Sequence, residues 1–306
     1  MPAAQASRLS FCGAPPVISR ARVDSGSGPT QGPITAVILT KNEELRLRNA
    51  LASLRFCERV IVLDSGSADQ TGNVARAAGA EFVVHVPEPP FRISEQRNWA
   101  LEHLEITTPW ILFLDADEEI PPTLASKLIS VALAPGTAYD AYELTPRYIF
   151  WDRWLKRTQG YPNWHPRFVR HGFTRFAGGV WEHFEEGTRV GRISLPYDHF
   201  ANCKGLKDWL DRHYRYASWD ADRVIAALDS GDYSQLGTTR KAVLRRLAAR
   251  FWPLRPITRF VHMYVIRLGF LEGLPALNFC LLYAFYELMI VNLIVERRRQ
   301  RRGQSL

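Results

Sequence analysis

The sequence predicts an α/β fold built around a parallel, doubly wound sheet. Between residues 34 and 133, four short apolar runs alternate with segments whose apolar residues recur at helical spacing. This alternation is typical of parallel strands joined by crossover helices. Because ligands bind at the carboxyl ends of the strands in such sheets, the residues after each apolar run are the first candidates for a site.

The expected elements follow one another in chain order. The first strand, 34–40, is a short apolar run, and the helix expected at 43–54 carries leucines at helical spacing among charges. The later expected elements are the strands 59–64, 81–86 and 110–115 and the helices 69–78, 93–104 and 121–133. Beyond them, residues 139–200 are predicted to be strand-rich, and residues 205–235 and 238–296 to be helical.

Composition places the chain among ordinary globular proteins. It has 306 residues, of which 46% are hydrophobic and 23% charged, so a disulfide-stapled miniprotein, a collagen-like fibre and a wholly disordered chain are excluded. The four cysteines are scattered, which disfavours a zinc site or a disulfide framework and suits a reducing compartment. The N-terminal apolar stretch is short and broken by proline, so it is a poor secretory signal and we expect a cytoplasmic protein.

The chain is expected to divide into three regions. Residues 1–32 are rich in Pro, Gly, Ser and Ala and are predicted to form a disordered extension. Residues 33–205 are predicted to form the catalytic domain, and residues 206–306 a basic helical region that associates with a membrane or with other copies of the chain.

The first two expected strands end in polar residues. Thr40 is followed by Lys41, Asn42 and Glu43, and the pattern G-x-G-x-x-G is absent, which disfavours NAD or FAD; the Walker pattern is absent too. Asn42 suits a helix N-cap. After the second strand, Ser67 and Gln70 suit a capping box, which leaves Asp64 at the strand tip as an acceptor for a base or a ribose.

The fourth expected strand ends in the strongest candidate motif. Asp115 and Asp117 bracket one residue directly after an apolar run. Two carboxylates this close repel unless a cation or a donor network is present, and their spacing suits Mg²⁺ or Mn²⁺ that bridges to substrate phosphates. The alternative is an acidic first turn before a helix. Arg97, on the preceding helix, could face a diphosphate or be a solvated surface charge.

These motifs, in this order, resemble the family 2 glycosyltransferases of the GT-A fold. The residues that carry the resemblance are Thr40-Lys41-Asn42-Glu43, Asp64-Ser65-Gly66-Ser67, Gln96-Arg97-Asn98 and Asp115-Ala116-Asp117-Glu118. The stretches Pro166–Arg170 and Gly178–His183 are similar to the bacterial branch that includes the lipopolysaccharide core β-1,4-glucosyltransferases, in which His is typical where this chain has Trp181.

The resemblance implies a role for each candidate residue. Nucleotide-sugar binding falls to Thr40, Glu43, Asp64, Arg97 and Asp115, metal binding to Asp117 and Asp115, and the role of catalytic base to Glu182. A carboxylate base without a covalent intermediate gives inversion at the anomeric carbon. We therefore expect an inverting transfer of a hexose, such as glucose, from a nucleotide-sugar, such as a UDP-sugar, to a glycan or lipid-linked acceptor, assisted by Mn²⁺ or Mg²⁺.

Alternatives stay open at this point. Glu182 could instead be an exposed residue paired with His183 or Arg192. Trp181, beside Glu182, is the best aromatic candidate for the acceptor site, and His183, on the other side of Glu182, is a second candidate for it. A second class of function is a catalytically inactive domain of this fold that binds a membrane or nucleic acid. A nucleotidyltransferase would usually carry a glycine-rich loop with a basic residue after the first strand, and none occurs.

The basic excess of the chain lies at its C-terminal end. The formal net charge is +8, yet residues 238–306 alone hold 13 Lys and Arg against three Asp and Glu, a net charge of +10. Residues 239–251 predict a basic amphipathic helix. Residues 277–295 approach the length of a membrane span, but Glu287 interrupts them, which favours a helix that lies on a membrane or packs in an oligomer. An anionic membrane surface is the expected partner, and nucleic acid is not.

Overall fold

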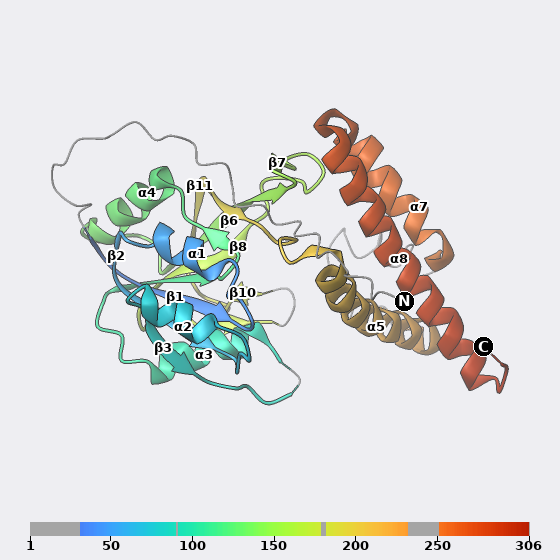
Figure 1. Cartoon of the computed structure of the whole chain (residues 1–306), viewed down its shortest axis with the longest axis horizontal. Helices are drawn as coiled ribbons and strands as arrows, with labels where there is room; N and C mark the ends of the chain where they lie inside the picture. The colour runs from blue at the N-terminus through green and yellow to red at the C-terminus, as the bar shows by residue number, and fades with distance from the viewer. Residues whose placement is uncertain (1–30, 90, 179–181, 232–250, 306) are drawn as a thin grey trace, which may run out of the picture. The chain divides into compact units, whose positions relative to one another are not determined.

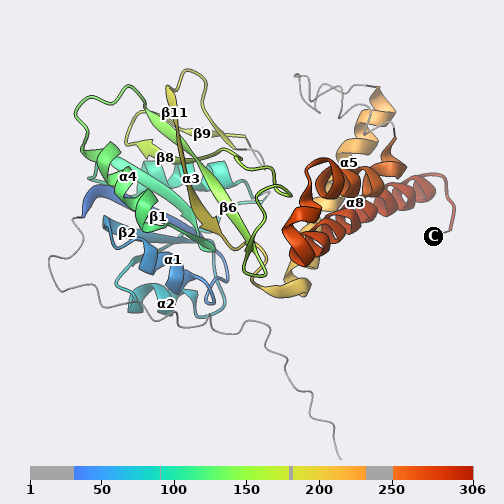
Figure 2. The same ribbon diagram turned by 90° about the horizontal axis from the view of Figure 1, so that it is seen from above.

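The computed structural model describes residues 31–89, 91–178, 182–231 and 251–305, which Figures 1 and 2 show as ribbons. The chain forms two compact units. The first holds the residues up to Leu144 together with Pro166–Leu195, and the second holds Thr145–His165 and the residues from Pro196 onward. The three regions expected from the sequence stay a prediction. The structure groups residues 145–165 with the C-terminal helices.

The four expected parallel strands are present. They are β1 (Gly32–Thr40), β2 (Cys57–Asp64), β3 (Glu81–Val84) and β4 (Trp110–Asp115). β1 lies between β2 and β4, and all three run parallel. Thr40 is level with Asp64 in one register and Leu39 with Asp115 in the other, so the candidate side chains emerge at one edge of the sheet.

The sheet continues beyond β4. The strand order is β3-β2-β1-β4-β8-β6-β11-β5, and β8 runs antiparallel to β4. These strands and the small ones beside them are β5 (Glu118–Glu119), β6 (Ala141–Phe150), β7 (Arg153–Trp154), β8 (His165–Arg170), β9 (Phe176–Ala177), β10 (His183–Phe184) and β11 (Val190–His199). The prediction that residues 139–200 are strand-rich is confirmed.

Helices cover both sides of the parallel strands. They are α1 (Leu47–Ser53), α2 (Thr71–Ala77), α3 (Ile93–His103) and α4 (Pro122–Leu133). Figure 2 shows α1 and α2 on one side of β1 and β2 and α3 on the other. β4 is buried on both faces, since its first five residues are all buried, and this explains its unbroken apolar sequence.

Two capping predictions are wrong. Asn42 adopts a left-handed backbone conformation, with φ of 55°, and α1 begins only after Arg46, so Asn42 is not its N-cap. Asn42 Oδ1 instead accepts a hydrogen bond from the backbone N–H of Ala68. Ser67 does not cap α2 either, because its hydroxyl donates to Asp64 and accepts from the N–H of Asn42. The two loops are joined to each other and leave the helix ends without these caps.

The second unit is dominated by helices. Its main helices are α5 (Gly205–Ser230), α7 (Arg255–Phe260) and α8 (Gly273–Arg301), with a π-helical turn at Val261–Ile266 and a 3₁₀ turn at Gly269–Glu272. Apolar residues of α8 near Ile290 and Leu293 pack against Ala217 and Val224 of α5. Residues 239–250 of the expected amphipathic helix lie outside the described residues.

Glu287 of α8 is buried but paired. Its carboxylate accepts hydrogen bonds from Arg255 at 2.6 Å and from Arg259 at 2.6 and 2.8 Å. In the described part of the chain, one helical stretch, Gly269–Arg301, is long and apolar enough to cross a bilayer, and about a third of its apolar window is buried. The prediction that this helix lies on a membrane or packs between copies of the chain stays a prediction.

Candidate functional site

The ends of β1 and β2 are joined by the carboxylate of Asp64. Asp64 is 1% exposed and accepts four hydrogen bonds: from the hydroxyls of Thr40 (2.9 Å) and Ser67 (2.5 Å) and from the N–H groups of Gly66 (2.8 Å) and Ser67 (2.6 Å). A carboxylate offers about four acceptor positions. Asp64 therefore organises the loop between β2 and α2, and its expected contact with a nucleotide base stays a prediction.

Glu43 lies beside this loop. Its N–H donates to the hydroxyl of Thr71 at 2.8 Å, and the N–H of Ser65 donates to the carbonyl of Thr40 at 2.9 Å. The structure thus brings Thr40, Glu43 and Asp64 to one edge of the sheet. This is the arrangement that a shared binding pocket requires.

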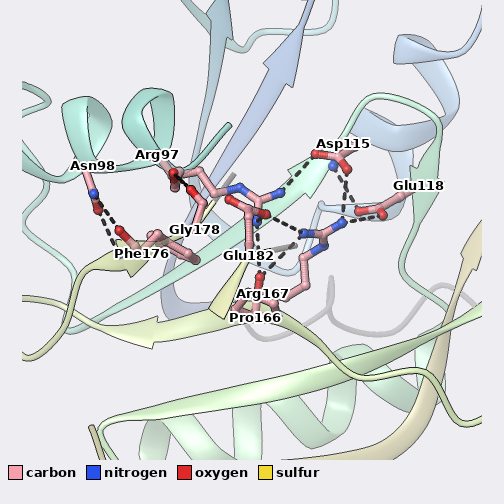
Figure 3. Close-up of polar contacts among 10 residues, drawn as sticks. Arg97, Asn98, Asp115, Glu118, Pro166, Arg167, Phe176, Gly178 and Glu182 are labelled. Carbon is pink, nitrogen blue, oxygen red and sulfur yellow. Dashed lines mark hydrogen bonds and ion pairs between the residues drawn. The ribbon is translucent and has the colours of Figure 1, made fainter. Parts of the chain in front are cut away.

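A cluster of five charged side chains lies at the end of β4 (Figure 3). We call it the ion-pair cluster, and it comprises Arg97, Asp115, Glu118, Arg167 and Glu182. Arg97 donates from Nη1 to Glu182 Oε2 at 2.7 Å and from Nη2 to Asp115 Oδ1 at 3.1 Å. Nη2 of Arg167 donates to Asp115 Oδ2 at 3.0 Å and to Glu118 Oε1 at 2.8 Å.

Backbone contacts hold the cluster in place. Both atoms of the Asn98 side-chain amide bond to the backbone of Phe176 at 2.8 Å, and the hydroxyl of Ser94 donates to the carbonyl of Gly178. These bonds fasten the segment that leads to Glu182 against α3 (Figure 3). Glu118 Oε2 accepts from the N–H of Asp115 at 3.0 Å, which fixes the turn after β4.

The ion-pair cluster decides two of the open alternatives. Arg97 has no exposed surface, so it is not a solvated helix charge. The Glu182 side chain is 8% exposed and pairs with Arg97, so it is not an exposed residue held by His183 or Arg192. Arg192 pairs instead with Glu143 at 2.9 Å.

The acceptor candidates are only partly described. Trp181 lies outside the described residues. His183 is exposed and, with Tyr139, Glu143 and Arg192, lines an open cavity of about 530 Å³. The prediction that both residues contact an acceptor stays a prediction.

Sequence reasoning assigned no role to Arg167 and Glu118, although both complete the ion-pair cluster. The sequence contains an indication of a role for each of these two residues. Arg167 precedes the apolar pair Phe168-Val169 within a strand, and Glu118 follows the two aspartates of the β4 motif. A charge inside a buried strand needs a partner of opposite sign, so Arg167 alone could have indicated a buried carboxylate nearby.

The pKa of Glu182 is raised above its ordinary value. Burial is the largest cause, because it disfavours the charged form. Arg97 and Arg167 oppose this shift, while the like charges of Asp115 and Glu118 add to it. Glu182 Oε1 is buried and has no hydrogen-bond partner within the described residues. A buried carboxylate oxygen in this state is an acceptor for a proton or a hydroxyl group.

The sequence was compared with models of protein families. The family model "Glycosyl transferase family 2" matches residues 35–195, just over half of the chain. The chain belongs to glycosyl transferase family 2. The match spans β1 through most of β11 and so includes every residue of the ion-pair cluster. It confirms the predicted α/β, GT-A fold of this glycosyltransferase.

Curated relatives of this glycosyltransferase match over a shorter stretch. An uncharacterized glycosyltransferase of Rickettsia bellii is 36% identical over 113 residues, which are 36% of this chain and 37% of the relative. The lipopolysaccharide core biosynthesis glycosyltransferase LpsC of Rhizobium meliloti is 32% identical over 98 residues, which are 31% of this chain and 36% of LpsC. The chain therefore matches only about a third of the length of these relatives.

Solved structures resemble this family 2 glycosyltransferase at low identity. Glucosyl-3-phosphoglycerate synthase from Mycobacterium tuberculosis, in complex with Mn²⁺, UDP and glucosyl-3-phosphoglycerate, is 18% identical. Its TM-score is 0.41, and the match covers 58% of this chain and 74% of the synthase.

Of the two aspartates predicted to bind a divalent cation, one fits that role better than the other. No group of three metal-ligating side chains converges among residues 31–89, 91–178, 182–231 and 251–305. Mg²⁺ bound to nucleotides needs only one or two carboxylates, because phosphates and water supply the other ligands. Asp117, half-buried just beyond β4, fits that role. Asp115 fits less well, because a guanidinium group already donates to each of its oxygens.

Proposed function

We propose that this family 2 glycosyltransferase transfers a hexose from a UDP-sugar, with inversion, to a glycan or lipid-linked acceptor in lipopolysaccharide or related cell-envelope synthesis. The buried Oε1 of Glu182, without a hydrogen-bond partner among the described residues, carries the proposal. The likeness to LpsC over a third of its length supports the class of acceptor.

Glu182 acts as the general base. As the acceptor oxygen attacks the anomeric carbon, its proton passes to Glu182 Oε1 and a new C–O bond forms. The bond from the anomeric carbon to the donor diphosphate breaks on the opposite side, and its electrons leave with the diphosphate. Arg97 holds Oε2 at 2.7 Å, so the carboxylate is oriented with Oε1 available to the acceptor hydroxyl.

The nucleotide lies along the carboxyl ends of β1, β2 and β4. Thr40, Glu43 and the loop organised by Asp64 line its base and ribose. Asp117 would hold Mn²⁺ or Mg²⁺, and that cation offsets the charge that develops on the leaving diphosphate. Arg97 and Arg167 keep Asp115 fixed beside this position.

The enzyme works at the cytoplasmic face of the cell membrane. The net charge of +10 over residues 238–306 and the apolar stretch Gly269–Arg301 support this placement.

A donor screen tests the proposed transfer. Purified protein is incubated with radiolabelled nucleotide-sugars, with isolated membranes as acceptor, and incorporated label is counted. We expect one UDP-hexose to be incorporated in the presence of Mn²⁺ or Mg²⁺, and we expect EDTA to abolish incorporation reversibly. If no nucleotide-sugar is bound or turned over with either cation, the transferase proposal is wrong and an inactive domain of this fold is the better description.

The pH dependence of transfer tests the role of Glu182. Because its pKa is raised, Glu182 becomes protonated while the pH is still above the ordinary glutamate value of about 4.5. A protonated carboxyl cannot act as a base, so kcat/KM should fall as the pH drops through this raised value. The acid limb should be missing from the residual activity of Glu182→Gln; an unchanged limb in that variant would assign it to another group.

A further inference from the structure

A short loop of the second unit and Arg267 together present three cationic side chains to a pocket. The loop, 155–161, follows β7 and forms one helical turn, closed by the bonds from Gln159 N–H to the carbonyl of Leu155 and from Tyr161 N–H to that of Lys156. Glu272 fastens the turn, since its carboxylate accepts from the N–H groups of Arg157 (2.6 Å) and Thr158 (2.9 Å) and from the Thr158 hydroxyl.

The pocket beside this turn is strongly basic. It has a volume of about 330 Å³ and is lined by Lys156, Arg157, Gly160, Tyr161 and Arg267. A Cβ atom on Gly160 would lie 2.5 Å from Nη1 of Arg267, so the guanidinium packs directly on this glycine. The ammonium of Lys156 lies 5.7 Å from the centre of the Tyr161 ring.

No acidic side chain of the described residues forms an ion pair with the three cations of this pocket. The nearby acids are already engaged: Glu272 accepts from the backbone of the turn, and Glu287 is held by Arg255 and Arg259. Among the described residues, the Arg267 guanidinium donates one hydrogen bond, to the carbonyl of Thr158 at 3.4 Å. Three positive charges left together without a counterion attract a multiply charged anion.

The surface around Arg267 shows which anion fits. Large apolar side chains close to it in the sequence are exposed: Ile266 by 67%, Leu268 by 40%, Leu271 by 54% and Leu274 by 65%. Soluble proteins seldom expose so many large apolar side chains together. An apolar surface beside unpaired Lys and Arg is typical of proteins that lie in the interface of an anionic membrane.

We propose that the pocket formed by Lys156, Arg157 and Arg267 binds the phosphate of an anionic phospholipid head group, while the exposed apolar residues beside it enter the acyl boundary. The three cations supply the donors that a phosphate needs. The inference rests on the proposed membrane association and adds a head-group site that glycosyl transfer itself does not require.

Vesicle binding by the full chain tests the site. The variant Lys156→Ala/Arg157→Ala/Arg267→Ala is compared with wild type on vesicles of phosphatidylglycerol and phosphatidylcholine, and on phosphatidylcholine alone. We expect the variant to partition roughly a hundredfold more weakly onto the anionic vesicles. The matched control is Arg48→Ala/Arg55→Ala/Lys127→Ala, which removes the same three charges from exposed positions of the first unit and should bind within threefold of wild type.

A second variant tests the site without disturbing the fold of the loop. Removal of Arg267 also removes its bond to Thr158, so Lys156→Glu, which leaves that bond in place, should weaken binding by itself about tenfold or more. Equal vesicle binding by wild type and both variants would overturn the pocket and leave membrane association standing. Absence of vesicle binding by wild type would overturn both, while donor turnover, measured separately, would still decide the transferase proposal.

The source of the phosphate is tested by calorimetry. Inorganic phosphate is titrated into wild type and into the triple variant. Millimolar or weaker binding, lost in the variant, is expected for a site that needs a bilayer to hold its ligand. Micromolar binding of free phosphate, together with vesicle binding that does not depend on the three cations, would assign the pocket to a soluble phosphate compound and overturn the membrane proposal.

Discussion

Replacement of Glu182 by Gln is expected to lower the kcat of hexose transfer by at least about a hundredfold, the range in which general bases contribute. The amide has nearly the same volume and can still accept a hydrogen bond from Arg97, so the surrounding ion pairs keep their geometry. It cannot take up a proton from the acceptor hydroxyl. Initial rates at saturating donor measure the effect, and the Kd of UDP should change by less than threefold.

The matched control is Glu185→Gln. Glu185 lies three residues further along the same segment, is half-exposed, and its carboxylate lies 3.7 Å from Arg175 at the surface. Its replacement should leave kcat within twofold of wild type. Near-full turnover by Glu182→Gln, with nucleotide binding intact, would remove Glu182 from the chemistry.

Replacement of Arg97 by Met is expected to destabilise the first unit by about 3–5 kcal/mol, the cost of leaving buried charges without their partner. Arg97 has no exposed surface and contacts Glu182, Asp115 and the carbonyl of Pro166, so all three acceptors lose a donor. Met keeps much of the side-chain volume between the rings of Phe113 and Phe176, and the loss is therefore chiefly electrostatic. Urea denaturation followed by tryptophan fluorescence measures the change.

Arg92→Met serves as the control for this substitution. Arg92 lies at the start of the same helix and pairs only at the surface, at 3.2 Å from Glu95. Exposed pairs of this kind contribute less than about 1 kcal/mol. If both variants unfold at the same urea concentration, the ion pairs of Arg97 do not stabilise the fold and the described role of the cluster is wrong.

The inner parallel strands β1 and β4 could be predicted closely because they are buried on both faces. The run before Asp115 is apolar without a break, and β4 ends at that aspartate. β3 ends at Val84, two residues before the end that the sequence predicts, and Val84 and Val86 are exposed at the sheet margin. A strand buried on both faces has an unbroken apolar sequence. A half-exposed strand at the margin of the sheet has no such run, so its end cannot be predicted from the sequence.

The caps and the ion-pair cluster could not be predicted because their partners are distant in sequence. Asn42 and Ser67 have local patterns typical of helix caps, yet each bonds to the other's loop, some 25 residues away. Glu182 meets Arg97 across 85 residues, and only the return of the chain through β8 and β9 brings them together. The charge of Glu287 predicts an interruption of the apolar helix, but Arg255 and Arg259, which lie on another helix, pair with it, and no local pattern indicates this.

Arg97 connects two carboxylates, and this makes their charges interdependent. The charge of Asp115 raises the pKa of Glu182, so a ligand that donates positive charge to Asp115 lowers the proton affinity of Glu182. By thermodynamic reciprocity, loss of the proton from Glu182 strengthens the binding of that ligand by the same free energy. A cation bound at this edge of the sheet would therefore favour the ionised, proton-accepting form of Glu182, whereas an anionic diphosphate alone would act in the opposite sense.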